Sequence, residues 1–294
     1  MKLKRFFIGL CVLSAAGVLP LSAHPDGHTK VISLLPSTTE ILYALEAQDK
    51  VIGVTRYCMF PPEARKEKTI VGGLLDVNYE VIYSLNPDLV ILQDDENELV
   101  SRMKKMKIPT LQIETRSLDG IIKSIELIGE AVDKKEKAQQ IVGEIKQMVE
   151  YVQKMTKDLT KPTILVTYLR PLGEGSIREV YIAGNFTFFD DLIEIAGGVN
   201  AYQGSEMITS PVISPEGILR LNPDIIIELM AGIAEERFTP EEIRKDWDML
   251  PQLDAHKNNR IFILKQPYIG IPGPRVAQTL MDMARIIHPE VKWE

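Results

Sequence analysis

Short apolar runs alternate with longer amphipathic stretches along the chain from about residue 30 onward. The runs are rich in β-branched residues, whereas the longer stretches carry apolar residues at three- and four-residue spacing, which is typical of strands and helices respectively. Strands that alternate with helices in this way pair in parallel, so the pattern predicts a fold of the α/β class. The predicted strands are residues 30–34, 51–55, 70–75, 89–92, 108–113, 163–168, 180–183, 225–228 and 260–264.

The longest helical pattern extends from about residue 134 to residue 159, and no proline interrupts it. At about 1.5 Å per residue this helix would be roughly 37 Å long, enough to cross a small domain. We therefore assign residues 133–160 to a rigid helix that joins an N-terminal lobe (30–132) to a C-terminal lobe (161–294). Each lobe would hold a central, mainly parallel sheet, with a ligand cleft between the lobes. A surface helix of one larger domain is the alternative.

One motif occurs twice, once in each predicted lobe. The first copy, Val77–Leu92, reads VNYEVIYSLNPDLVIL, and the second, Ile213–Glu228, reads ISPEGILRLNPDIIIE. Each copy predicts a short helix that stops at Asn-Pro-Asp, because the residue before proline is disfavoured in the α region, and then a buried strand. Glu80 and Glu216 fall in the first turn of these helices, where the helix dipole favours a negative charge. Two carboxylates at the same offset in two lobes also suit docking onto a partner with two basic pockets.

Capping signals mark the starts of these helices and of an earlier one. Asn78 and Ser214 carry side-chain oxygens that can accept a hydrogen bond from the first turn of each repeated helix. Ser37, with Glu40 three residues later, fits a capping box. We therefore expect helices to begin just after these positions.

The composition and the N-terminal segment indicate an exported protein. Hydrophobic residues make up 45% of the chain and the net charge is -7, which argues against a nucleic-acid-binding surface. Residues 1–23 combine a basic start, an apolar run and Leu-Ser-Ala, which predicts a signal peptide cleaved near Ala23. Residues 24–29 would then form the flexible N-terminus of a periplasmic protein. A membrane anchor is the alternative, although the apolar run is short for a span.

The sequence offers little for catalysis or for a resident metal ion. None of the four histidines belongs to an HExxH motif or to a Ser/His/Asp arrangement, and no P-loop or GxGxxG is present. Residues 30–117 contain no histidine, although a metal site between two lobes needs ligands from both. Cleavage would leave Cys58 as the only cysteine, which we expect to be a buried structural thiol. We therefore expect a binding protein that is not an enzyme and has no cofactor of its own.

The loops that follow the predicted strands hold the candidate ligand-binding residues, because ligands of open α/β sheets bind beyond the carboxyl ends of the strands. Tyrosine and arginine contribute strongly to binding when they are desolvated, and arginine suits a ligand with carboxylate or other anionic groups. A solvated surface charge is the alternative for each arginine. The candidates are Arg56, Tyr57, residues 72–75, residues 94–97 and Arg116 in the first lobe, and Tyr168, Arg170, residues 230–232, Tyr268 and Arg275 in the second.

Six stretches make the chain resemble a known family. They are VISLLPSTTEILYAL, IGVTRYCMFPPEA, the two repeat copies, AGGVN (Ala196–Asn200) and PGPRVAQTL (Pro272–Leu280). They resemble the periplasmic substrate-binding proteins of ABC importers for iron chelates and vitamin B12, over essentially the whole mature chain. The resemblance implies two α/β lobes joined by one rigid helix, a small hinge motion, and an ABC permease as partner. It also places Glu80 and Glu216 where family members carry glutamates that contact arginines of the permease.

The resemblance leaves the ligand open between a corrinoid and a ferric siderophore, so the bound ligand would contain cobalt or iron. Tyr57 matches a tyrosine that the cobalamin-binding members carry after the second strand. Where those members have tryptophans, this chain has Leu74, Gln93 and Ser210, and Tyr268 lies near a fourth. Haem held by a tyrosine, a free metal ion, and an exported metal-dependent enzyme are the alternatives. We expect a monomer that captures a metal chelate and delivers it to the permease.

Overall fold

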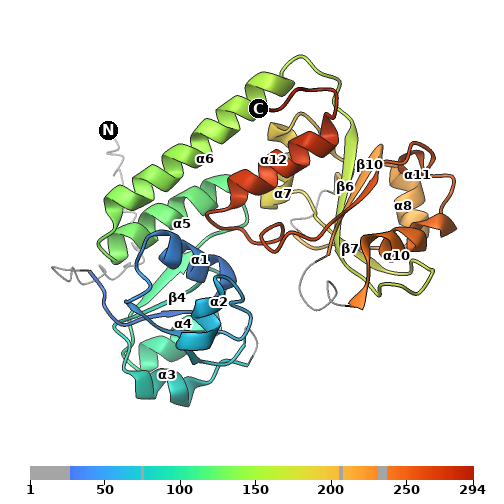
Figure 1. Cartoon of the computed structure of the whole chain (residues 1–294). Coiled ribbons are helices and arrows are strands. Elements are labelled where there is room, and N and C mark those ends of the chain that lie inside the picture. The colour runs from blue at the N-terminus through green and yellow to red at the C-terminus, as the bar shows by residue number, and fades with distance from the viewer. Residues whose placement is uncertain (1–26, 74–75, 205–207, 231–236) are drawn as a thin grey trace, which may run out of the picture.

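The computed structural model describes residues 27–73, 76–204, 208–230 and 237–294. These residues form two α/β lobes with a group of helices lying between and across them (Figure 1), which confirms the predicted fold class. The predicted signal peptide and Leu74 lie outside the described residues. Within the described ranges, no helix combines the length and the hydrophobicity needed to cross a bilayer.

The first lobe is built on a five-stranded parallel sheet in the order β3-β2-β1-β4-β5. The first four residues of β4 are all buried, as expected for a strand that is covered on both faces. The elements are β1 (Val31–Ser33), α1 (Pro36–Ala44), β2 (Val51–Val54), α2 (Pro62–Glu67), β3 (Thr69–Ile70), α3 (Tyr79–Leu85), β4 (Leu89–Gln93), α4 (Asn97–Lys105) and β5 (Thr110–Ile113).

The second lobe is built on a six-stranded mixed sheet. Strands β6, β10 and β11 are parallel, β7 runs antiparallel between β6 and β9, and the short β8 pairs with the start of β6. All residues of β10 are buried. The elements are β6 (Thr163–Leu169), β7 (Val180–Ile182), α7 (Phe188–Ile195), β8 (Val199–Asn200), β9 (Val212–Ile213), α8 (Pro215–Leu221), β10 (Ile225–Leu229), α10 (Pro240–Lys245), the 3-10 helix η1 (Asp246–Met249), α11 (Asp254–Lys257), β11 (Ile261–Leu264) and α12 (Val276–Ile287).

Two helices carry the chain from the first sheet to the second. Helix α5 (Leu118–Ala131) follows β5, and α6 (Lys135–Thr156) then continues for 22 residues, a length of roughly 33 Å. The predicted boundaries at residues 133 and 160 fall in the segments on either side of α6. The buried residues of α6 recur at helical spacing: Ala138, Ile141, Val142, Ile145, Val152 and Thr156.

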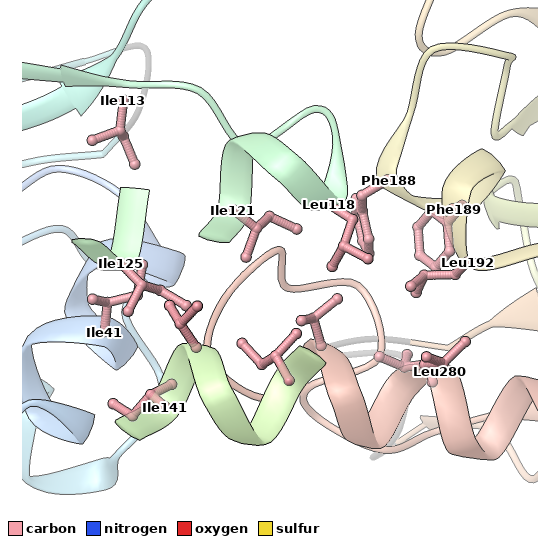
Figure 2. Packing of buried hydrophobic residues seen from close by; sticks show 14 of the residues in the cluster. Ile41, Ile113, Leu118, Ile121, Ile125, Ile141, Phe188, Phe189, Leu192 and Leu280 are labelled. Atoms are coloured by element: carbon pink, nitrogen blue, oxygen red, sulfur yellow. The ribbon is translucent and has the colours of Figure 1, made fainter. Parts of the chain in front are cut away.

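One apolar cluster runs through both lobes by way of four helices. Helix α5 packs on α6, and α12 packs on both α6 and α7. Figure 2 shows Ile41 of the first lobe, Ile121 of α5 and Leu280 of α12 as members of this cluster, and each is almost completely buried. Burial of apolar surface is the dominant force in folding, so this shared core holds the lobes as one packed body. The joint between the lobes is therefore a layer of helices (α5, α6, α7 and α12, hereafter the helix layer), of which the connecting helix is one member.

We expect Ile121→Ala to lower the free energy of unfolding by about 2–5 kcal/mol, because the substitution opens a cavity in the helix layer. Urea unfolding followed by circular dichroism would measure the loss. The matched control is Gln153→Ala on the exposed side of α6, which should change stability by less than about 0.5 kcal/mol. Because the core is continuous, both variants should unfold in one transition. Separate transitions for the two lobes would contradict a shared core.

Candidate functional site

The repeated helices α3 and α8 share the same caps at both ends. At the start of α3 the Asn78 side chain accepts a hydrogen bond from the backbone N–H of Val81 (3.1 Å), and Ser214 accepts the equivalent bond at the start of α8. Both helices end at an asparagine in the left-handed region, with φ 48° at Asn86 and 41° at Asn222. The helices stop at Asn-Pro-Asp as predicted, with the asparagine left-handed because it is one of the few residues that tolerate this conformation.

The aspartate of each Asn-Pro-Asp turn fastens the repeat to the neighbouring central strand, a role that the sequence analysis missed. Asp88 accepts hydrogen bonds from the N–H and the hydroxyl of Thr29, just before β1, and Asp224 accepts the same pair from Thr163, the first residue of β6. Burial opposes ionisation of Asp88, but the N–H groups of Thr29 and Lys30 outweigh it and lower the pKa of the carboxyl. The sequence feature that could have indicated this role is a threonine at or just before the start of β1 and of β6, the strands beside the two repeats.

Glu80 and Glu216 lie in the first turns of α3 and α8, and both are exposed. Among the described residues, no ion pair joins either carboxylate to another side chain, and a hydrogen bond from Ser214 lowers the pKa of Glu216. Each helix links parallel strands and therefore begins at the carboxyl edge of its sheet. Helices α3 and α8, which carry the two glutamates, thus lie on separate lobes (Figure 1), and each begins at the sheet edge where the predicted ligand-binding loops emerge.

The carboxyl edges of the two sheets meet around Arg275. Its Nε and Nη2 donate to the two carboxylate oxygens of Glu40 at 2.9 and 2.7 Å, so the loop after β11 is tied to α1 of the first lobe. The guanidinium also lies over the rings of Phe60, 3.8 Å away, and Tyr268, 5.2 Å away. This junction corrects two predictions, because Glu40 pairs with a residue far along the chain instead of completing a capping box, and Arg275 is already bound to a carboxylate.

The helix that contains Glu40 also begins differently from the prediction. Its N-cap is Leu35, which makes no side-chain capping bond, and Pro36 occupies the first helical position, where its missing N–H costs nothing. Ser37 lies inside the helix and is buried. The proline therefore starts the helix one residue before the predicted cap.

Arg170 does not line the cleft, which corrects the prediction for this residue. Its side chain is 1% exposed and makes ion pairs of 2.7 Å with both Glu228 and Asp246. Trp247 donates its indole N–H to Glu228 in the same cluster, and the Asp246 carboxylate accepts the N–H groups of residues 173 and 175. A buried charge needs partners of opposite sign, so Arg170 turns inward and fixes the loop that follows β6.

Of the two remaining predicted arginines, Arg56 is exposed and Arg116 is half-buried, and both are paired. Arg56 makes a two-pronged contact with Asp76 at 2.8 and 2.7 Å, and Arg116 makes the same contact with Asp94 at 2.8 and 2.6 Å. All four arginines that were expected to attract an anionic ligand therefore already face a carboxylate. The positive charge of these loops is largely neutralised by the protein itself.

Of the other predicted side chains, Gln93 and Tyr168 lie near the ends of β4 and β6 and Tyr268 lies in the loop after β11, and their polar groups are engaged. Gln93 ends β4 and accepts a hydrogen bond from the Thr115 hydroxyl. The Tyr168 hydroxyl bonds to Ser210, and burial, which outweighs this bond, raises the pKa of Tyr168. Tyr268 donates to Asp282 at 2.8 Å, and burial followed by that carboxylate raises the pKa of Tyr268 to about 12. Both phenols are therefore neutral at physiological pH.

Exposed apolar side chains lie at the same edge, and of these only Tyr57 was among the predicted ligand-binding residues. Tyr57, Met59 and Phe60 follow β2, and Tyr57 and Met59 are 55% and 60% exposed. Leu169, which is 59% exposed, ends β6 and pairs across the sheet with the half-exposed Tyr181. Apolar surface left in contact with water at a strand edge marks an interaction site. The TRYCMF sequence directly after a predicted strand could have indicated the exposed side chains of the first lobe.

The structure also shows where Cys58 lies and whether side chains that could bind a free metal ion lie together. Cys58 is fully buried, as predicted, and accepts a hydrogen bond from Thr39; burial raises the pKa of its thiol. Across the described part of the chain, no three histidine, cysteine, aspartate or glutamate side chains gather in a way that could hold a metal ion.

Comparison with known proteins agrees with the geometry. A family model described as periplasmic binding protein matches residues 31–268. The uncharacterized ABC transporter substrate-binding lipoprotein YvrC of Bacillus subtilis is 29% identical over 89% of this chain and 80% of its own length. A cobalamin-binding protein of Halobacterium salinarum is 25% identical over 92% of this chain and 71% of its own length. The structure of the periplasmic heme-binding protein RhuT from Roseiflexus sp. RS-1 superposes with a TM-score of 0.74 at 24% identity, covering 90% of this chain and 99% of that protein.

Arg275→Ala should lower the free energy of unfolding by about 3–5 kcal/mol, because it leaves the Glu40 carboxylate buried without a counter-charge. Burial already raises the pKa of Glu40, and Arg275 opposes that rise, so the variant's pKa would be higher still. The folded variant then binds a proton more tightly than the unfolded chain. Its stability deficit should be greatest above the raised pKa and shrink as the pH falls toward the unfolded value of 4.5.

Urea unfolding at about pH 5 and about pH 8 would measure this dependence. Arg56→Ala is the matched control, because it removes a similar two-pronged pair at the surface and should cost less than about 1 kcal/mol at either pH. Equal losses in the two variants, or a deficit for Arg275→Ala that does not change with pH, would contradict a buried junction between the lobes.

Proposed function

The chain belongs to the periplasmic binding protein family, and from this premise we propose that it is the receptor of an ABC importer for a metal chelate. The receptor would capture the chelate between its lobes outside the cytoplasmic membrane and deliver it to the permease. It would act as a monomer, by binding alone and without catalysis. The observation that carries this proposal is the repeated helix start that presents Glu80 on one lobe and Glu216 on the other.

The placement of the two glutamates suits docking onto a permease. Each carboxylate is exposed, has no ion-pair partner among the described residues, and stands on a short helix capped at both ends. Because each helix begins at the carboxyl edge of its sheet, each docking group lies at the same sheet edge as the predicted ligand-binding loops of its lobe. A receptor docked through Glu80 and Glu216 would therefore hold its ligand against the permease.

The ligand-binding loops favour a large chelate with apolar faces. The arginines that would attract an anionic ligand are already neutralised, whereas Tyr57, Met59 and Leu169 present apolar surface to water. Burying such surface on a flat ligand is favourable, and tyrosine binds well in this way because it is rigid. We therefore propose a corrinoid, which carries cobalt, ahead of a carboxylate-rich ferric siderophore. The cobalamin-binding relative supports the same choice.

Haem is the second candidate, and Tyr57 is the residue that favours it. A tyrosine phenolate can serve as an axial ligand of haem iron, and Tyr57 is largely exposed. Tyr168 is half-buried and hydrogen-bonded to Ser210. Capture of a free metal ion has less support, because the described residues gather no set of ligands for it.

In calorimetric titration of the mature protein, cyanocobalamin or cobinamide should bind saturably at one-to-one stoichiometry, whereas haemin and ferric siderophores should bind weakly. Tyr57→Ala should weaken corrinoid binding by about tenfold or more, since it removes exposed aromatic surface from the loop after β2. The control is Tyr83→Ala on α3, which removes an even more exposed tyrosine from outside the predicted ligand-binding loops. Saturation by haemin alone, with a Tyr57-dependent absorption spectrum, would replace the corrinoid by haem. Saturation by a ferric siderophore alone would overturn the preference for apolar faces.

Glu80→Ala combined with Glu216→Ala should abolish uptake of the radiolabelled ligand by cells, because both anchoring carboxylates are lost. Ligand affinity of the purified double variant should stay within about twofold of the parent, since neither carboxylate makes an ion pair with a predicted ligand-binding residue among the described residues. Glu63→Ala with Glu241→Ala is a charge-matched control, one exposed glutamate in the first turn of a helix on each lobe. Normal uptake by the Glu80 and Glu216 double variant would refute the docking assignment.

A further inference from the structure

The two repeated helices have the same backbone design but different side chains beside their glutamates. Three residues after Glu80, Tyr83 is 66% exposed, the largest value among the exposed large hydrophobic residues of the described chain. The equivalent position after Glu216 is Leu219, which is partly buried against the core of the second lobe. One position further on, α3 carries the exposed Ser84 and α8 carries the exposed Arg220.

Glu80 and Tyr83 lie on the same face of α3, because residues three apart on a helix are neighbours, about 5–6 Å apart between Cβ atoms. A carboxylate beside an aromatic face suits one chemical group in particular. The arginine guanidinium is planar, binds a carboxylate through two N–H groups and is attracted to the face of an aromatic ring. On α8, an incoming arginine would meet Glu216 with the like charge of Arg220 one turn away.

We propose that α3 holds an arginine side chain of the permease between the Glu80 carboxylate and the Tyr83 ring, whereas α8 holds its arginine through Glu216 alone. This inference rests on the proposed docking function and adds that the two ends of the receptor are unequal. The first lobe would supply the larger part of the affinity for the permease. On a permease built from two different halves, the inequality would also decide which lobe meets which half.

The test is the affinity of the mature receptor for its cognate ABC permease reconstituted in lipid nanodiscs. Tyr83→Ala should weaken binding by about 5- to 30-fold, the range expected when a cation loses its contact with an aromatic ring. Tyr83→Phe keeps the ring and should stay within about twofold of the parent. The control is Ser84→Ala, which changes an exposed neighbour on the same helix and should also leave the affinity within about twofold of the parent.

A double-mutant cycle tests whether the ring and the carboxylate hold the same group. In the Glu80→Ala background, Tyr83→Ala should cost less than about twofold, because the arginine is no longer held over the ring. In the Glu216→Ala background, the same substitution should keep its full effect. Equal effects of Tyr83→Ala in both backgrounds would overturn the proposed clamp.

The outcomes separate this inference from the docking proposal on which it rests. If Glu80→Ala and Glu216→Ala both leave permease affinity unchanged, docking through these helices is wrong and the clamp falls with it. If they weaken binding but Tyr83→Ala does not, docking stands and the clamp alone is refuted. Unchanged thermal stability and ligand affinity of the Tyr83 variants would show that a loss of permease binding comes from the docking surface.

Discussion

The structure depends on one continuous apolar contact, the helix layer formed by α5, α6, α7 and α12. Because it buries residues of both lobes in one cluster, the lobes cannot separate without exposing core to water (Figure 2). This contact places the loop after β11 against α1, where Arg275 reaches Glu40 across the junction. A receptor with such a joint would respond to its ligand by a small adjustment, because a large closure would break the packing of the layer.

The polar groups of the molecule follow from that rigid frame. At the carboxyl edges of both sheets, arginines are matched by carboxylates of the same protein, so that these edges carry little free positive charge. Apolar side chains such as Tyr57 and Leu169 are left exposed instead. At the repeated helices α3 and α8 the balance is reversed, since Glu80 and Glu216 make no ion pair among the described residues. The exposed apolar side chains therefore suit contact with a ligand, whereas the two exposed glutamates suit contact with a partner protein.

Features encoded locally could be predicted from the sequence. The alternation of apolar runs with helical patterns indicated two α/β lobes, and the repeated helix, its caps and its Asn-Pro-Asp end were readable within sixteen residues. The antiparallel pairing of β7 with its neighbours β6 and β9 was not foreseen, because strand direction depends on pairing and not on hydrophobic periodicity. The role of Asp88 and Asp224 was missed for the same reason, since their threonine partners lie 59 and 61 residues away.

The sequence by itself determined the fold class, the repeated units and the exposure of Glu80 and Glu216, because helix periodicity and capping act within one or two turns. Only the tertiary structure decided which charges remain available. Arg170 and Arg275 occupy similar loop positions in the sequence, yet one is sealed in the second lobe by Glu228 and the other bridges the lobes to Glu40, 235 residues away. A buried charge is stable only beside an opposite charge, and the packing of the folded chain determines which carboxylate lies beside each arginine.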